Sequence, residues 1–122
     1  MTAPDPAECA PTSSRALGVD IASEAAGVLR SIADPLRLRM LSAIAADPRG
    51  EACVCDLNDL ADVSQPTISH HLKVLRDSGW LTSERRGTWV YYRIAEARRE
   101  AATVLLGPAV AALTAPDERV AP

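Results

Sequence analysis

Two short segments hold the side chains with the clearest chemical potential. Cys53 and Cys55 are separated by one residue, in the stretch Cys53 to Leu57 (CVCDL). Thiolates are soft ligands, which favour soft metal ions and metalloids over magnesium or calcium. Seven residues after Leu57 begins the run Ser64 to Leu72 (SQPTISHHL), which is rich in hydrogen-bonding side chains. A soft-metal clamp next to a polar helix suggests a switch, in which filling the clamp moves the helix.

The position of the two cysteines relative to a helix decides whether both can hold one ion. In a strand, residues i and i+2 point to the same face, whereas in a regular helix they lie about 200° apart. We expect a short helix from roughly Asp56 to Ala61, which places Cys53 and Cys55 before it or in its irregular first turn. A helix N-terminus also favours the thiolate form that binds metal. Taken alone, however, a Cys-x-Cys pair is equally compatible with two cysteines that bind nothing.

The length of 122 residues predicts one domain with a modest core, which a dimer would enlarge. Residues 1–18, with Cys9, are predicted to form a flexible arm, residues 19–114 the folded domain and residues 115–122 a tail. No secretory signal is expected, because the N-terminus lacks a basic start and an apolar segment. No membrane span is expected either, because the uncharged run 101–116 is shorter than about 20 residues. We therefore expect a cytoplasmic protein, in which free thiols are favoured over a structural disulfide.

Charge is distributed unevenly along the chain. The formal net charge is -3, which alone argues against a nucleic-acid partner. Residues 64–93, however, hold five cations against two carboxylates, whereas residues 1–63 are net acidic. The positive charge is therefore concentrated in one segment, where it can contact phosphates. A local excess of this size also arises by chance, so it only supports the other evidence.

Caps and apolar periodicity predict two helices ahead of the cysteine pair. The first runs from Asp20, as its cap, to about Ile32. The second begins at the cap and first-turn proline Asp34-Pro35, and the segment DPRG at residues 47–50 ends it.

The polar run is predicted to form a further helix, capped by Ser64 and ended by Ser78-Gly79. Its apolar stripe, at spacings of four and three, turns the polar side chains between its members away from the core. The stripe consists of Ile68, Leu72 and Leu75. The outward polar residues suit the base edges and phosphates of DNA; they are Gln65, Thr67, Ser69, His70, Lys73 and Arg76. For this helix in isolation, a solvated polar face is the alternative. His71 lies nearer the stripe and is expected to be structural.

Two strand-like runs follow, residues 80–85 and 88–94, joined at Arg86-Gly87 as in a β-hairpin. The residues from Ala95 to about Leu106 are predicted to be helical, and the apolar residues up to Leu113 exceed what the edge of a small core needs. We predict that they form a surface buried by a partner and interrupted at Gly107-Pro108. The expected fold is mainly α with a small β-hairpin: four helices, two strands and a final helix, the order of a winged helix-turn-helix.

The stretch from about Leu29 to Ile94 resembles the ArsR/SmtB family of metal-sensing repressors. Four motifs carry the resemblance in the same order: DPLRL at 34–38, CVCDL at 53–57, the run 64–75 and the residues 87–92. It implies a homodimer, built through the first and last helices, that binds an inverted-repeat operator in double-stranded DNA when metal-free and leaves it when metal binds. It also implies that Gln65, Ser69 and His70 read bases. Arg86, at the hairpin tip, is then expected in the minor groove or on a phosphate.

The third ligand decides which ion is expected. Asn58 and Asp59 follow the cysteine box where some arsenic-sensing relatives have a further cysteine nearby, so Cys9 is the remaining thiol. Three thiolates neutralise As(III) or Sb(III) and complete its pyramidal geometry, whereas a divalent ion usually seeks a fourth ligand. We therefore expect As(III) or Sb(III) as the inducer, bound by Cys9, Cys53 and Cys55, with Cd(II) or Pb(II) as alternatives. A Cys9 that takes no part is also compatible with the sequence.

Two other classes of function are alternatives to this one. The first is a thiol redox or persulfide sensor on the same DNA-binding scaffold, in which Cys9 pairs oxidatively with Cys53 or Cys55, since a disulfide within Cys-x-Cys itself is expected to be strained. The second is an enzyme with Cys55 as nucleophile and His70 or His71 as base. We expect no enzyme and no catalytic residues, because the sequence offers neither a third orienting group at a suitable spacing nor a Gly-rich phosphate loop.

Overall fold

The computed structural model of the chain describes residues 11–116, so Cys9 lies outside the described residues. The elements in chain order are the 3-10 turn η2 (Thr12–Ser14), α1 (Val19–Ile32), α2 (Pro35–Ala46), β1 (Ala52–Cys53), α3 (Val54–Leu57), α4 (Gln65–Asp77), β2 (Leu81–Arg86), β3 (Trp89–Ile94), the 3-10 turn η3 (Glu96–Arg98), α5 (Arg99–Val104), the π-helical segment η4 (Leu105–Ala109) and α6 (Val110–Thr114). This is the winged helix-turn-helix predicted from the sequence.

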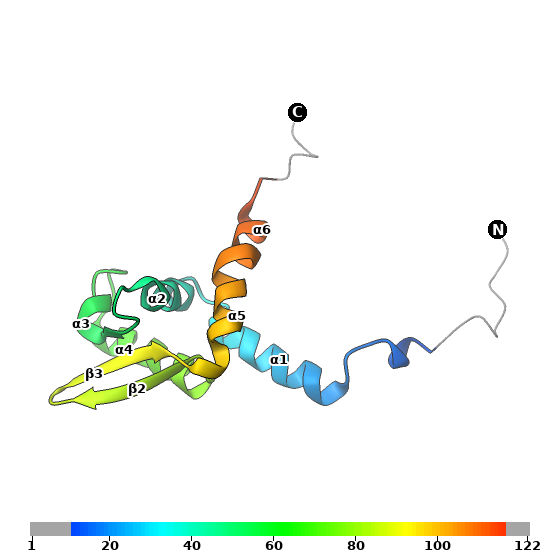
Figure 1. Cartoon of the computed structure of the whole chain (residues 1–122), viewed down its shortest axis with the longest axis horizontal. Coiled ribbons are helices and arrows are strands. Elements are labelled where there is room, and N and C mark those ends of the chain that lie inside the picture. Colours follow the sequence, from blue (N-terminus) through cyan, green and yellow to red (C-terminus); the bar gives the residue numbers. More distant parts are fainter. Residues whose placement is uncertain (1–10, 117–122) are drawn as a thin grey trace.

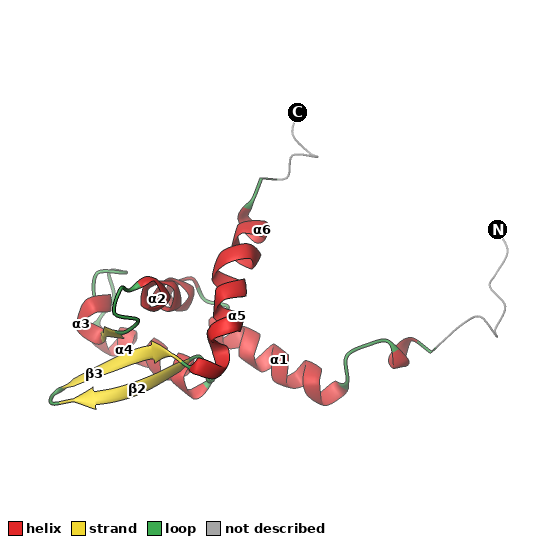
Figure 2. Ribbon diagram, in the orientation of Figure 1, coloured by secondary structure: helices red, strands yellow, loops and turns green. Residues whose placement is uncertain are grey.

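The elements separate into a compact body and two projecting helices. Helices α2, α3 and α4 gather beside the hairpin of β2 and β3 (Figure 1). Helix α1 extends away from this body in one direction, and the rod of α5, η4 and α6 extends in another (Figure 2). The two projecting helices are the ones from which a partner surface was predicted.

The helices of the body begin where their caps predict. The Asp34 carboxylate accepts the backbone N–H of Arg37 at 2.9 Å, and Pro35 occupies the first turn, where no N–H is needed. In the same way, the Ser64 hydroxyl accepts the N–H of Thr67 at 3.3 Å at the start of α4. Both starts are fixed by residues next to them in the chain, which is why the sequence alone could locate them.

The core lies between α2, α3 and α4. Its fully buried large side chains come from these three helices and include the whole predicted stripe of α4; they are Met40, Leu41, Ile44, Leu57, Ile68, Leu72 and Leu75. Burying a side chain of this size contributes about 1.5–3 kcal/mol, so seven of them fix how α4 sits on the body. The polar face of α4 is consequently held outward.

The sheet has three antiparallel strands in the order β1-β3-β2, one more than the predicted hairpin. The additional strand is only two residues long, and it pairs Ala52 with Tyr92 and Cys53 with Tyr91. The hairpin itself turns at Gly87-Thr88, because Arg86 pairs with Trp89. Gly87 has a φ of 64°, which a two-residue hairpin turn requires at its first position. The new strand places Cys53 in the sheet, directly ahead of α3.

Three helix boundaries differ from the predicted ones. Helix α1 starts at Val19 with Gly18 at its N-cap, so Asp20 lies inside the first turn instead of capping it. Helix α3 starts at Val54, two residues earlier than predicted, and ends at Leu57. The final helix passes through Gly107-Pro108 without a break, because the π turn of η4 widens the helix where Pro108 lacks an N–H. Among the described residues, no helix is long and apolar enough to span a bilayer.

Candidate metal site and nucleic-acid interface

The polar residues of α4 that were predicted to contact DNA lie on its outer face. Gln65, His70 and Lys73 are exposed, while Ser69 and Thr67 are half-buried. The Thr67 hydroxyl lies 2.9 Å from the Ser64 hydroxyl, so it also takes part in the cap. The helix therefore presents a row of donors and acceptors at its N-terminal half, the size and chemistry that fit a major groove.

The two adjacent histidines of α4 have different surroundings. His71 is half-buried, and its Nδ1 lies 3.1 Å from the Arg37 guanidinium of α2. Arg37 in turn donates from Nε to the carbonyl of Ser31 at 2.6 Å. His71 thus joins α4 to α2 and to the end of α1, whereas His70 faces solvent.

Cys53 and Cys55 come together at the start of α3, where their sulfurs form a disulfide with the Cα atoms 5.3 Å apart. Free thiols were expected, and a bridge within Cys-x-Cys was expected to be strained. The pairing follows from the backbone: Cys53 is extended, with φ -97° and ψ 172°, and serves as the N-cap, so Cys55 in the first turn comes to the same side. Cys53 is 2% exposed and Cys55 is exposed, which leaves the pair accessible from one side.

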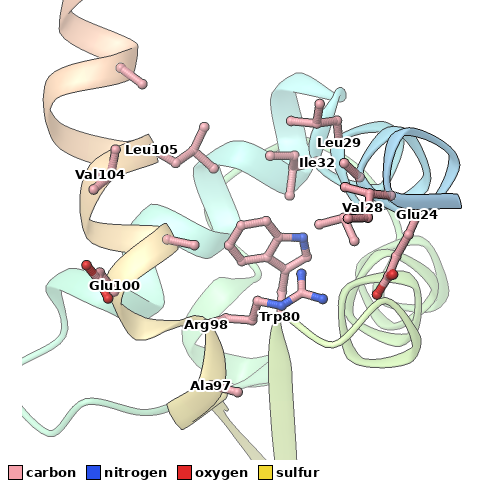
Figure 3. A pocket seen from close by; sticks show the side chains of 14 residues that line it. Glu24, Val28, Leu29, Ile32, Trp80, Ala97, Arg98, Glu100, Val104 and Leu105 are labelled. Atoms are coloured by element: carbon pink, nitrogen blue, oxygen red, sulfur yellow. The ribbon is translucent and has the colours of Figure 1, made fainter. Parts of the chain in front are cut away.

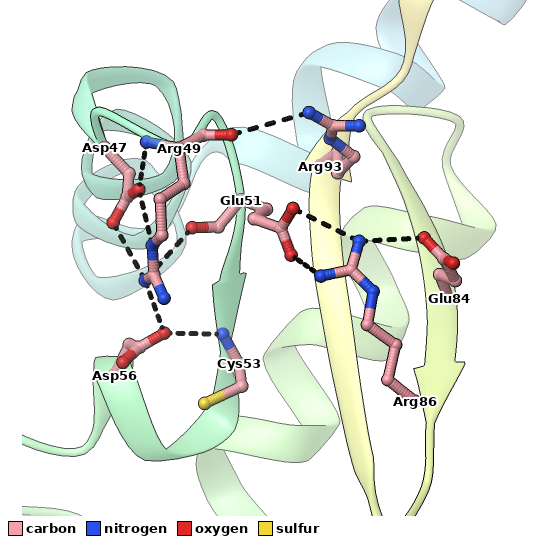
Figure 4. Close-up of polar contacts among 8 residues, drawn as sticks. All are labelled: Asp47, Arg49, Glu51, Cys53, Asp56, Glu84, Arg86 and Arg93. Carbon is pink, nitrogen blue, oxygen red and sulfur yellow. Dashed lines mark hydrogen bonds and ion pairs between the residues drawn. The ribbon is translucent and has the colours of Figure 1, made fainter.

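A carboxylate completes this cluster. The ligand atoms of Cys53, Cys55 and Asp56 all lie within 4.8 Å of one another. The Asp56 carboxylate accepts the backbone N–H of Cys53 at 3.0 Å and the guanidinium of Arg49 at 2.9 Å. These two contacts lower the pKa of Asp56, the Cys53 N–H being the larger cause. Arg49 is itself held by Asp47, so a small polar network orients the first turn of α3 (Figure 4).

Arg86, predicted as a DNA contact at the hairpin tip, is partly exposed and forms ion pairs with carboxylates of its own chain. Its guanidinium donates to both carboxylate oxygens of Glu51, one of them at 3.2 Å, and to Glu84 at 3.0 Å. It also lies 4.5 Å from the centre of the Tyr91 ring. The β2–β3 hairpin is the wing of this fold. Figure 4 shows the Arg86 side chain extending from the wing toward the segment that carries Glu51. Arg86 thus pairs with two carboxylates of its own chain, while 43% of its side chain stays exposed.

Glu51 was not recognised in the sequence. It is 8% exposed and stands two residues before Cys53, on the segment that becomes β1. Its pairing with Arg86 spans 35 positions of the chain, so no local pattern points to it. Through this pair the strand of the cysteine box is joined to the wing.

An apolar groove opens between the two projecting helices. It has a volume of about 790 Å³ and is lined mainly by apolar residues of α1 and of the final helix, with Trp80 between them (Figure 3). Three charged residues also line it: Glu24, Arg98 and Glu100. Trp80 is buried and donates from its indole N–H to Ser31 at 3.1 Å. Large apolar side chains around the groove remain exposed: Leu29 by 59% and Val104 by 54%. The groove includes Val104 and Leu105, which belong to the apolar segment for which a partner surface was predicted.

Comparison with known proteins bears on these features. The family described as "Bacterial regulatory protein, arsR family" matches residues 34–83, which include the cysteine box and α4. The transcriptional repressor BigR of Xylella fastidiosa has the same fold with a TM-score of 0.63 and 30% identity, over 80% of this chain and 93% of that one. The chain belongs to the arsR family. Family members that match it are transcriptional regulators, not enzymes.

Two further relatives are informative about ligand and assembly. An arsenic resistance transcriptional regulator of Pseudomonas putida is 48% identical over 67 residues, which are 55% of this chain and 51% of that protein. The chain thus spans about half the length of that curated relative. A homodimeric winged helix-turn-helix DNA-binding domain from Mycobacterium bovis has a TM-score of 0.66 at 25% identity, over 84% of this chain and 90% of that one.

Proposed function

We propose that the protein is a dimeric transcriptional repressor that binds an inverted-repeat operator through α4 and releases it when As(III) or Sb(III) binds its cysteines. The observation that carries this proposal is the pairing of Cys53 and Cys55 at the start of α3, one turn and a loop ahead of α4. A thiol pair so close to the DNA-reading helix can affect how that helix is held.

The DNA contact is supported by the exposed polar row of α4. Ser69 and His70 would read base edges, and Lys73 would hold a phosphate. The two α4 helices of a dimer would enter successive major grooves about 34 Å apart, so the operator should be nearly palindromic. The homodimeric neighbour and the apolar groove support this assembly.

Arsenite chemistry fits the cysteine cluster. A dithiol reductant would reduce the Cys53–Cys55 bond. The two sulfurs of the reductant would form a disulfide with each other, and Cys53 and Cys55 would become free thiols. Each thiol would then replace one hydroxide of arsenous acid, forming an As–S bond and releasing water. The third position would go to Cys9, which lies outside the described residues. Asp56 is less suited to it, because Arg49 and the Cys53 N–H already use its carboxylate.

The ion pair between Glu51 and Arg86 supports a route from the cysteines to the DNA-binding surface. β1 makes only two residue pairs with β3, so its position depends on the residues at its ends. Glu51 fixes one end to the wing, and Asp56 fixes the other to Arg49. Coordination of an ion by Cys53 and Cys55 would reshape the first turn of α3 between them, and both the wing and α4 would follow.

The test is release of a labelled operator duplex, first selected from random sequences, by arsenite, cadmium and zinc under reducing conditions. Cys53→Ser and Cys55→Ser should each bind the duplex as the wild type does and fail to respond to arsenite. Cys9→Ser should respond weakly or not at all if Cys9 closes the site. Release of the Cys53/Cys55 double variant at the wild-type arsenite concentration would show that the clamp is misassigned. A stronger response to cadmium than to arsenite would overturn the trivalent selectivity and favour Cd(II) or Pb(II).

A second candidate, a thiol redox or persulfide sensor, is favoured by the disulfide itself. Oxidation by one molecule of hydrogen peroxide would convert the two thiols to the disulfide and release two water molecules. Mass spectrometry separates the two functions. An arsenite adduct on the reduced protein that accompanies DNA release supports the metalloid sensor, whereas release that follows the loss of two hydrogen atoms after peroxide treatment supports the redox sensor.

A further inference from the structure

The wing is the part of the candidate DNA interface where the structure departs most from the expectation. Arg86 was expected to supply its charge, yet Glu51 and Glu84 bind this guanidinium. Although 43% of its side chain is exposed, Arg86 would approach a duplex together with two carboxylates that offset its charge, unless the ion pairs, one of them with the buried Glu51, are broken. Removing the partner of a buried charge is costly, so the pair with Glu51 is expected to persist.

Two other side chains at the tip remain available. Trp89, the first residue of β3, follows the two-residue turn directly and is 53% exposed. Arg85 is also exposed, and its strand partner is Val90, so it lies on the opposite face of the hairpin from Arg86. Trp89 pairs with Arg86, so Arg85 and Trp89 flank the tip from its two faces. Within the described part of the chain, no carboxylate pairs with Arg85.

The location of the tip suits contact with the same duplex that α4 would bind. The tip lies at the end of the molecule that holds α3 and α4, away from α1 and α6 (Figure 1). Exposure of the apolar indole ring to water at the end of a narrow hairpin is unfavourable in free energy. Burial of the ring against deoxyriboses or a groove wall would remove this cost. The chain's other tryptophan, Trp80, is buried under the groove, so Trp89 is the exposed indole.

We propose that Trp89 and Arg85, and not Arg86, are the DNA contacts of the wing: Trp89 packs its ring against the sugars and groove wall, and Arg85 neutralises a phosphate. This inference rests on the proposed function, because it assumes that α4 binds a duplex. It divides the wing into an apolar contact, a charged contact and an internal ion pair. These three roles differ in how they depend on salt.

The experiment measures binding of the selected operator duplex over a range of salt concentrations. Trp89→Ala should weaken binding about tenfold at fixed salt, the loss expected for a buried ring, without changing the slope of log affinity against log salt. Arg85→Gln should reduce that slope by about one. The matched control is the double variant Glu51→Gln/Arg86→Gln, which removes the other arginine without leaving the buried Glu51 carboxylate unpaired; the exposed Glu84 loses its partner but stays in water. Its slope should equal that of the wild type.

A second readout uses tryptophan fluorescence. Acrylamide should quench Trp89 in the free protein, and the duplex should protect it, while Trp89→Phe should retain most of the affinity lost in Trp89→Ala. If Trp89→Ala binds as the wild type does, or changes only the oligomeric state in sedimentation, the Trp89 assignment is overturned. A slope reduced in the control but not in Arg85→Gln overturns the Arg85 assignment. Failure of the wild type to bind any duplex overturns the proposed function instead.

Discussion

At the residue scale, the neighbouring histidines of α4 illustrate how one position decides a role. A helix turns about 100° per residue, so adjacent side chains can lie on different faces. His71 reaches Arg37 on α2, while His70 faces solvent beside Ser69. The same side chain is therefore a packing element at one position and a candidate base contact at the next.

This difference gives a paired prediction. His70→Ala and Ser69→Ala should each weaken specific operator binding by about 1–3 kcal/mol, because each removes a contact to a base edge, with little change in thermal stability. His71→Ala should instead lower the unfolding temperature, since Arg37 loses its contact with α4 and keeps only the Ser31 carbonyl. Competition titrations at fixed salt and thermal unfolding measure the two effects. Equal specific binding by wild type and His70→Ala would remove His70 from the base-reading set.

Asp56 gives a prediction about pH. Contacts with the Cys53 N–H and with Arg49 hold its pKa below the ordinary value of 3.8. A carboxyl group whose pKa is lowered by folding stabilises the folded state at pH values above its pKa in the unfolded chain. This stabilisation is lost as the pH falls through its pKa in the folded protein. The difference in unfolding free energy between wild type and Asp56→Asn should therefore be largest near pH 7 and shrink below about pH 4. Denaturant titrations across this range measure it, and a difference independent of pH would contradict the assignment.

At the scale of elements, the sequence predicted the features that local residues determine and missed those that depend on pairing between distant segments. Helices α2 and α4 were correctly placed because Asp34, Ser64 and the apolar stripe of α4 act within a few residues. Strand β1 was missed because two residues carry no periodicity, and its existence depends on pairing with β3 about 40 positions later. The ion pair between Glu51 and Arg86 was missed for the same reason, because its partners are 35 positions apart. The cysteine box was found as a motif, but its bridge depended on where α3 begins.

The link between β1 and the wing leads to a prediction about the switch. Glu51→Gln should leave arsenite affinity of the free protein unchanged, while more arsenite is needed to release DNA, because the neutral amide holds Arg86 less tightly. The coupling free energy between two ligands, here arsenite and DNA, is typically about 1–3 kcal/mol. The variant should lose a measurable part of this coupling. Arsenite titrations with and without operator determine the coupling. Glu84→Gln is the matched control, since it removes the other carboxylate of Arg86 without touching β1. An equal loss in both variants would mean that β1 is not the route.

At the scale of the whole molecule, the exposed apolar surface and the position of the polar face of α4 are compatible with one kind of assembly. The groove between α1 and the final helix leaves large apolar side chains in water, which a second copy would cover. The body at the other end carries the polar row of α4 and the wing. A dimer formed through the projecting helices would therefore present two DNA-binding ends together.

This arrangement predicts that dimerisation and operator binding are lost together. Leu29→Glu and Val104→Glu each place a carboxylate in the groove, where a partner would have to bury it, so both variants should sediment as monomers. Val63→Glu is the control for oligomeric state, because Val63 is also exposed but precedes α4. It should remain a dimer.

Operator affinity of the monomeric variants should fall about a hundredfold or more, because each half-site is then bound independently. A duplex carrying a single half-site should bind wild type and monomer with similar affinity. A monomeric variant that still binds the full operator as tightly as the wild type would show that the two ends of the assembly act separately.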